Sequence, residues 1–283
     1  MENAVEVREL RKSYDGVEAV RGISFELRAG EVFGLLGPNG AGKTTTVEIL
    51  EGYRRPDAGE VSVLGVDPRG AGTDWRERIG VVPQTGELFP NLTVIEHLEL
   101  FAGYYSNPRP ALEVLELIGL EQKAGSKTRT LSGGQKRRLD LGIALVGDPE
   151  LLFLDEPTTG FDPGARRAAW ETIKSLRSLG KTILLTTHYI EEAQRLADRV
   201  AVLRQGEIVA AGTPAQLTAA APASRISYRR DGEEVVIETE EPTRVLHELT
   251  ERALSEGFEL EALEVHRPTL EDVYLSLTEG KPE

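Results

Sequence analysis

The stretch "GPNGAGKTT", from Gly37 to Thr45, constrains the fold more than any other part of the 283-residue chain. It satisfies the pattern G-x-x-x-x-G-K-[ST], which cradles phosphate groups when it follows a strand and opens a helix. The apolar run "VFGLLG" precedes it, and "KTTTVEILEGY", with an apolar stripe at helical spacing, follows it. A chance glycine-rich turn is a weaker explanation, because it does not account for a strand before the loop and a helix after it. We predict a phosphate-binding loop in which Lys43 reaches the β- and γ-phosphates of a nucleotide and the Thr44 hydroxyl ligates Mg²⁺.

Strands and helices alternate through most of the chain. The apolar runs "LLFLD", "KTILLTTH" and "VAVLRQGEIVAAG" each indicate a strand, and the segments between them have helical spacing. From Trp75 to about Gly125 the pattern is helical and more polar, with Leu112, Leu115 and Ile118 predicted to pack in the core. This alternation predicts an α/β fold with a mostly parallel sheet.

The last part of the chain has a different composition. Residues 222–283 contain 7 basic and 16 acidic residues, a balance of −9 within a whole-chain charge of −14. The shift predicts a linker near 219–224 and two domains, 1–220 and 221–283. "RISYRR" and "EVVIETE" predict a hairpin around Asp231-Gly232, and the helix, strand and helix that follow complete a small acidic α+β domain.

The composition also bears on where the chain acts. No run approaches the roughly 20 apolar residues of a membrane-spanning helix, and the start "MENAVEVREL" lacks the pattern of a secretory signal, so we expect a cytoplasmic protein. The absence of cysteine excludes disulfides and thiolate metal sites. The acidic balance provides no basic footprint for nucleic acid, and no nucleic-acid partner is expected.

Two carboxylates end the apolar run "LLFLDE". A carboxylate at the end of a buried strand is costly unless it meets a cation or hydrogen-bond donors. We predict that Asp155 belongs to the Mg²⁺ shell, through water, and that Glu156 orients the attacking water or accepts its proton. The alternative, two solvated carboxylates at a strand end, is disfavoured beside a phosphate-binding loop.

The string "LSGGQ", Leu131 to Gln135, opens another predicted helix. Two glycines at a helix N-terminus expose backbone N–H groups that suit a phosphate. Ser132 also suits the N-cap position, and the two interpretations are compatible. One phosphate-binding loop seldom needs a second phosphate-binding helix start in the same chain.

Taken together, these motifs resemble the nucleotide-binding subunits of ATP-binding cassette (ABC) transporters. The resemblance covers about 5–212, with "GPNGAGKTT", "VVPQ", "LSGGQ", "LLFLDEPTTGFD" and "LLTTH" in the family's order. It implies a P-loop NTPase cassette with antiparallel N-terminal strands and a helical subdomain at about 75–145. It also implies a head-to-tail dimer. In that dimer the "LSGGQ" string of one subunit, which is the family's signature, contacts the γ-phosphate bound at Lys43 of the other.

The resemblance assigns a role to each matching residue. Tyr14 stacks on adenine, Gln84 senses Mg²⁺ and the γ-phosphate, His188 hydrogen-bonds that phosphate and works with Glu156, and Asp162 communicates between the two sites. The nucleotide contacts that it implies are Asn39, Gly40, Ala41, Gly42, Lys43, Thr44, Thr45, Ser132, Gly133, Gly134 and Gln135. The metal contacts are Thr44, Gln84 and Asp155.

Some residues depart from the motifs or lie outside them. Phe161 stands where the family more often has leucine, which we interpret as a tolerated apolar exchange. Trp75 and Trp170 are predicted to be packing residues. The histidines other than His188 are expected to be structural: His97, His247 and His266.

Such a cassette serves in three kinds of protein: a transporter, a soluble translation or DNA-repair protein, and a regulator that binds ATP without hydrolysing it. A soluble translation protein would usually carry two cassettes, and a DNA-repair protein would place long coiled coils between the P-loop and the signature, where only about ninety residues lie here. A non-hydrolysing regulator would not need both Glu156 and His188. We therefore expect the ATPase of a transporter, which acts at the cytoplasmic face of the membrane through separate membrane subunits.

The direction of transport is inferred from two further stretches of sequence. "EGYRRPDAGEVSVLGVDP" and the terminal "HRPTLEDVYLSL" are similar to the ATPases of bacterial exporters related to daunorubicin-resistance proteins. An importer ATPase is the alternative. The acidic tail is interpreted as an extension of the dimer interface, with a regulatory role as the second interpretation.

Overall fold

The computed structural model describes residues 3–219, 224–230, 232–266 and 269–278. The chain divides into two compact units, Met1–Thr213 and Pro214–Glu283. Most of the linker predicted at 219–224 lies outside the described residues, as does Asp231 of the predicted hairpin turn. Each unit is described separately below.

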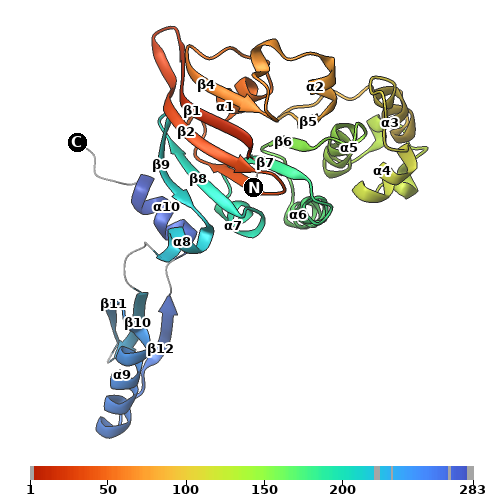
Figure 1. Cartoon of the computed structure of the whole chain (residues 1–283). Helices are drawn as coiled ribbons and strands as arrows, with labels where there is room; N and C mark the ends of the chain where they lie inside the picture. The colour runs from red at the N-terminus through yellow and green to blue at the C-terminus, as the bar shows by residue number, and fades with distance from the viewer. Residues whose placement is uncertain (1–2, 220–223, 231, 267–268, 279–283) are drawn as a thin grey trace. The chain divides into compact units, whose positions relative to one another are not determined.

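The first unit contains two sheets (Figure 1). A three-stranded antiparallel sheet has the order β2-β1-β4, and a six-stranded sheet has the order β5-β6-β7-β3-β8-β9. All neighbours in the larger sheet are parallel except β8 and β9. The strands are β1 Asn3–Tyr14, β2 Val17–Arg28, β3 Val32–Leu36, β4 Ala58–Val63, β5 Ile79–Val82, β6 Leu151–Asp155, β7 Thr182–Thr187, β8 Arg199–Arg204 and β9 Glu207–Gly212.

The helices of this unit connect its strands. They are α1 Lys43–Leu50, α2 Thr73–Glu77, α3 Val94–Ala102, α4 Ala111–Ile118, α5 Gly133–Leu145, α6 Pro163–Ser178 and α7 Ile190–Leu196. Helix α1 follows β3, α6 follows β6 and α7 follows β7, so these three helices start at the carboxyl ends of parallel strands. That edge of an open parallel sheet is the usual place for a ligand site.

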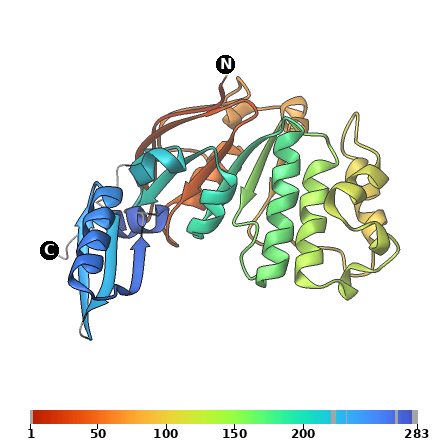
Figure 2. The ribbon, with the colours of Figure 1, turned by 90° about the horizontal axis from the view of Figure 1, so that it is seen from below.

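The core lies on both faces of the six-stranded sheet. Phe33, Phe153 and Leu184 pack with α1 and the three-stranded sheet, while Leu152 and Ile183, one residue away along β6 and β7, pack with the helices on the opposite face. Successive side chains of a strand point to opposite faces, which explains why these central strands are apolar throughout. Figure 2 shows α5 and α6, in green, side by side.

The structure confirms the predicted fold class, but three details of the prediction were wrong. "VAVLRQGEIVAAG" is two antiparallel strands, β8 and β9, because Gln205 and Gly206 both take positive φ values and form a tight turn. The helical stretch after Trp75 also contains the buried strand β5, which was missed. Leu112 is 69% exposed. It lies roughly 110° around α4 from the buried stripe of Val114, Leu115 and Ile118.

The second unit is a small α+β structure. Its strands β10 Ser224–Arg230, β11 Glu233–Thr239 and β12 Glu261–His266 form an antiparallel sheet in the order β11-β10-β12. Its helices are α8 Pro214–Ala219, α9 Pro242–Glu256 and α10 Leu270–Thr278. Ile226 and Tyr228 are buried on one sheet face, whereas Arg225 and Arg229 are exposed on the other. Strand β10 thus has one buried face and one face exposed to solvent.

Within the described residues, none of the helices combines the length and the apolar character needed to cross a lipid bilayer.

Candidate nucleotide-binding and hydrolysis site

A cavity of about 420 Å³ opens where β3 meets α1. It is lined by residues that were predicted from four separate stretches of the sequence, together with Ala19. These residues are Tyr14, Asn39, Gly40, Gly42, Lys43, Thr44, Thr45, Gln84 and Glu156. The tertiary structure therefore gathers the predicted P-loop, Tyr14, Gln84 and Glu156 around one space. Ala41, between the loop glycines, is buried at 2% exposure and packs into the core instead.

The loop backbone requires glycine at Gly42. Its φ of 101° is one that other residues rarely adopt, and a Cβ there would lie 2.4 Å from the backbone oxygen of Ala19. Gly40 also has a positive φ, of 80°. These conformations turn the chain directly into α1, whose first residue is Lys43. The N–H groups of this first turn have no partner within the helix, which suits an anion.

Lys43 is buried and directed toward its own loop. Its ammonium group donates to the backbone oxygens of Gly37 at 2.9 Å and Pro38 at 3.1 Å. The same nitrogen lies 3.1 Å from Oε1 of Glu156, with side-chain exposures of 4% and 5%. A buried ion pair without further hydrogen bonds would be costly, and here both partners have them.

The other oxygen of Glu156 is the meeting point of three further side chains. Gln84 Nε2 donates to Oε2 at 3.2 Å, Thr159 Oγ1 donates to it at 3.1 Å, and His188 Nδ1 lies 3.3 Å away. Glu156 itself has a φ of 47°, an uncommon conformation for a residue with a side chain. Such backbone strain is typical of functional sites, where the surroundings hold a residue in place.

This environment keeps Glu156 ionised. Burial by itself would raise the pKa of the carboxyl group, but the hydrogen bond and charge of Lys43, followed by His188, outweigh it, so the pKa of Glu156 is lowered from its ordinary value. An ionised carboxylate can accept a proton from water.

Asp155 lies one residue earlier and faces the P-loop helix. Thr44 Oγ1 donates to its Oδ2 at 3.1 Å, and the Thr186 hydroxyl donates to its Oδ1. The pairing of Asp155 with Thr186 across β6 and β7 brings these groups together. A carboxylate and a hydroxyl oxygen form a hard oxygen donor set, which fits Mg²⁺ better than softer metals.

The "LSGGQ" signature and the loop of Asp162 each begin a helix and do not line the cavity. Ser132 caps α5: its hydroxyl accepts from Gln135 N–H at 3.3 Å, and its own N–H donates to Gln135 Oε1 at 3.0 Å. The N-cap interpretation is thus confirmed. Asp162 caps α6 by accepting from Gly164 and Ala165. None of the described residues that line the cavity comes from 132–135 or 162, so these predicted contacts are not brought to Lys43 within one chain.

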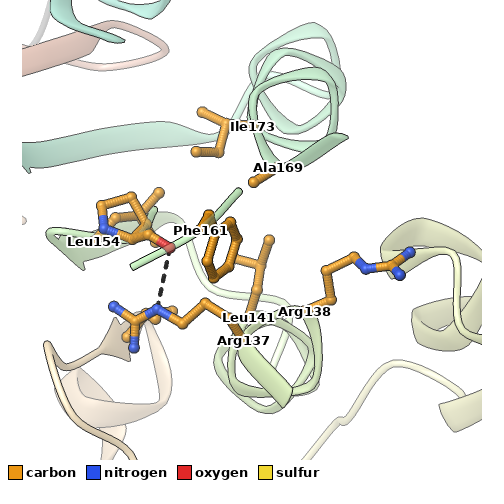
Figure 3. A pocket seen from close by; sticks show the side chains of 9 residues that line it. Arg137, Arg138, Leu141, Leu154, Phe161, Ala169 and Ile173 are labelled. Carbon is orange, nitrogen blue, oxygen red and sulfur yellow. Dashed lines mark hydrogen bonds between the residues drawn. The ribbon is translucent and has the colours of Figure 1, made fainter. Parts of the chain in front are cut away.

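Phe161 lies among side chains of β6, α5 and α6 (Figure 3). A cavity of about 20 Å³ beside its ring is lined by β5 and β6, by α5 and by α6. The lining includes Leu141 of the signature helix, Leu154 of β6 and Ile173 of α6. The aromatic ring therefore occupies an apolar site, as expected for a tolerated exchange.

The predicted packing residues behave as expected. Trp75 and Trp170 are buried at 5% and 3% exposure. His97, at 0% exposure, accepts from the Phe89 N–H through Nε2 and contacts the Thr93 carbonyl through Nδ1, which is a structural role.

Arg137 was missed by sequence reasoning. From α5 its guanidinium donates to the backbone oxygens of Asp155 at 2.9 Å and Pro157 at 3.2 Å, and to that of Pro83, which precedes Gln84. It thereby joins the signature helix to both loops that carry Gln84 and Glu156. Its position two residues after "LSGGQ" was the available signal, but an arginine on a helix is usually exposed.

Fold and site together define a P-loop ATPase cassette. A family model described as ABC transporter matches residues 20–159. The Nod factor export ATP-binding protein I of Burkholderia pseudomallei (strain 1710b) is 49% identical over 75% of this chain and 72% of its own length. The protein of the same name from Rhizobium meliloti (strain 1021) is 48% identical over 76% of this chain and 65% of its own length.

Solved structures of ABC cassettes are similar to this chain in fold. An ATP-binding subunit of an ABC transporter superposes with a TM-score of 0.68 at 30% identity, covering 76% of this chain and 92% of the other. A dimeric ATP-binding cassette in a post-hydrolysis state, bound to ADP and Pi, superposes with a TM-score of 0.67 at 28% identity, over 74% and 98% of the two chains. The chain belongs to the ABC transporter family, as one of its ATP-binding cassettes. The closer placement beside daunorubicin-resistance proteins stays a prediction.

Proposed function

We propose that this chain is the ATP-hydrolysing subunit of an exporter, and that two copies close head to tail on two ATP molecules. The observation that carries the proposal is the convergence of Lys43, Gln84 and His188 on the ionised carboxylate of Glu156, beside a phosphate-binding loop. Each of these groups has a part in phosphoryl transfer to water.

Lys43 exchanges partners when ATP binds. Its ammonium group turns from Glu156 toward the phosphates, which leaves a carboxylate oxygen of Glu156 without its strongest donor. Glu156 then accepts a hydrogen bond from the attacking water and takes up its proton as the water oxygen bonds to the γ-phosphorus. The bond from that phosphorus to the β–γ bridging oxygen breaks, and ADP leaves with that oxygen. Gln84 and His188 hold the water and the γ-phosphate oxygens in line.

Thr44, Asp155 and Gln84 would hold Mg²⁺. The ion would supply positive charge that offsets the charge of the phosphate oxygens. The 3.1 Å hydrogen bond between Thr44 Oγ1 and Asp155 Oδ2 supports this assignment, because it brings two hard oxygen donors together.

Dimer closure is supported by the absence of the "LSGGQ" residues from the lining of the cavity in their own chain. Ser132, Gly133, Gly134 and Gln135 present an exposed helix start that does not line the Lys43 cavity of its own chain. The similar cassette bound to ADP and Pi is a dimer, which supports supply of this helix start, and of Asp162, by a second copy. Tyr14 also lines the cavity, and an adenine ring would stack on it.

Export is supported by the names of the relatives, which are export ATP-binding proteins. Separate membrane subunits would hold the chain at the cytoplasmic face of the membrane. An importer role is less favoured because no relative described above is named for import.

The test is ATP hydrolysis by the full chain with Mg²⁺, compared between the wild type and Glu156→Gln. We expect turnover to fall by about 10²-fold or more, and an ATP-dependent dimer of Glu156→Gln to persist in light scattering. Glu26→Gln, an exposed carboxylate on β2, is the matched control and is expected to behave as the wild type. Unchanged hydrolysis by Glu156→Gln would refute the assignment.

A further inference from the structure

Helices α6 and α7 each follow a loop of the site. Asp162 caps α6, and the Arg166 N–H donates to the Asp162 carbonyl at 3.0 Å, so Arg166 lies one turn into that helix. His188 immediately precedes Tyr189, which is the N-cap residue of α7. The first turns of both helices are therefore tied to residues with predicted roles.

Arg166 and Tyr189 contact each other directly. The guanidinium carbon of Arg166 lies 4.1 Å from the centre of the Tyr189 ring, well within the range of a cation–π interaction. The Tyr189 ring in turn packs on the ring of His188, with centres 4.1 Å apart and an interplanar angle of 41°. Arg166, Tyr189 and His188 thus form a continuous stack that runs from α6 to Glu156.

A buried carboxylate fastens the same two helices one turn further along. Glu192 of α7 is 0% exposed and accepts from Trp170 Nε1 of α6 at 2.9 Å. It also accepts from the Thr158 hydroxyl, in the loop before Asp162, at 2.8 Å. These hydrogen bonds join α7 to α6 and to the loop before Asp162.

We propose that Arg166 and Tyr189 are positioning residues that transmit the position of the Asp162 loop to His188. This inference rests on the proposed function, because it concerns the orientation of His188 toward Glu156 during hydrolysis. A shift of the first turn of α6, such as a partner at the Asp162 loop would cause, moves the guanidinium and with it the two stacked rings.

The stack is expected to affect turnover rather than binding. Neither Arg166 nor Tyr189 is among the described residues that line the Lys43 cavity, so their removal leaves the nucleotide contacts in place. Removing the Tyr189 ring takes away one packing surface of the His188 ring, which then occupies more orientations. A group that must be held in one geometry loses rate when it is free to turn.

The experiment is a double-mutant cycle in the ATPase assay of the full chain. We expect Tyr189→Leu to lower kcat by about 10-fold with KM within about 2-fold, and Arg166→Gln to lower kcat by about 3-fold. The double variant is expected to match Tyr189→Leu alone, because the arginine acts through the ring. Tyr189→Phe, which keeps the ring, is expected to restore kcat to within about 2-fold of the wild type.

Arg167→Gln is the matched control, since Arg167 is the exposed neighbour of Arg166 on the same helix. It is expected to leave kcat unchanged. Circular dichroism and thermal unfolding check that each variant is folded. If Arg166→Gln does not fold, Arg166→Lys provides a milder change.

Two outcomes would overturn the inference on its own. In the first, Tyr189→Leu keeps the wild-type kcat while Glu156→Gln is inactive. In the second, kcat of the double variant falls by the product of the fold-changes that Arg166→Gln and Tyr189→Leu cause singly. A wild-type chain without ATP hydrolysis would instead overturn the proposed function together with this inference.

Discussion

Replacement of Lys43 by methionine is expected to lower the stability of the nucleotide-free chain, apart from its effect on ATP binding. The ammonium group makes three contacts, to the carbonyls of Gly37 and Pro38 and to Glu156 Oε1. Lys43→Met removes all three and leaves the Glu156 carboxylate, 5% exposed, without its nearest cation. An uncompensated buried charge is among the most destabilising changes that a single substitution causes.

The magnitude follows from what Glu156 retains. Breaking a buried ion pair by removing one partner typically costs 3–5 kcal/mol, and the remaining donors Gln84 and Thr159 place this case at the lower end, about 3 kcal/mol. Glu156→Gln in the same chain removes the stranded charge. The double variant Lys43→Met/Glu156→Gln is therefore expected to recover about half of the loss.

The dependence on pH has a definite sign. The folded-state pKa of Glu156 is lowered from its ordinary value of 4.5, so its contribution to stability is present above that value and is lost as the pH falls through the folded-state pKa. Lys43→Met removes the main cause of the lowering. The difference in unfolding free energy between wild type and Lys43→Met should thus be largest near neutral pH and shrink below about pH 4.

The assay is urea unfolding in EDTA, followed by tryptophan fluorescence. The chain has two tryptophans, Trp75 and Trp170, and both are buried in the first unit, so the signal reports the unit that holds the site. Lys174→Met is the control, because Lys174 pairs with Glu171 on the surface, with side-chain exposures of 43% and 72%, and such a pair is expected to contribute less than about 1 kcal/mol. Equal losses for Lys43→Met and Lys174→Met, or no recovery in the double variant, would refute the reasoning.

Three further predictions concern single residues. Burial, with the charges of Asp155 and Glu48 adding to it, raises the pKa of Glu51 to about 8; Glu51→Gln should therefore leave stability unchanged at pH 4 and raise it by about 1–2 kcal/mol at pH 8, measured by urea unfolding in EDTA. Gly42→Ala should abolish ATP binding in calorimetry and lower stability by about 2 kcal/mol, because its Cβ would meet a backbone oxygen at 2.4 Å. Hydrogen bonds from Thr269 lower the pKa of Asp272 to about 2, so Asp272→Asn should destabilise the second unit by up to about 1 kcal/mol above pH 4, and less as the pH falls toward 2, in circular dichroism melts.

Local chemistry explains which predictions succeeded. The P-loop conformation depends on glycines and a helix start within a few residues of each other, and the cap of α5 depends on Ser132 with Gln135. These features are built from neighbours in sequence, so pattern and residue type suffice to find them. The same holds for the central strands, whose burial on both faces makes them apolar throughout.

Distant contacts explain which predictions failed or were missed. Arg137 bonds to Pro83, Asp155 and Pro157, which lie 18 to 54 positions away, and Glu192 is buried against Thr158 and Trp170. The sequence around Glu192 does not distinguish it from an exposed helix residue, and for Arg137 the nearby "LSGGQ" was the available signal. Leu112 shows the converse, since an apolar residue at helical spacing lies on the exposed side of a short helix.

By itself, the sequence determined the phosphate-binding loop, the identity of the carboxylates and the alternation of strands and helices, because each is encoded by residues close together along the chain. Only the tertiary structure decided that Lys43, Gln84, Thr159 and His188 meet at one carboxylate, because their strands end at the same edge of a parallel sheet in an order that differs from the order of the chain. It also decided that Arg166 stacks on Tyr189, since that contact depends on how α6 and α7 pack beside each other and on no local pattern.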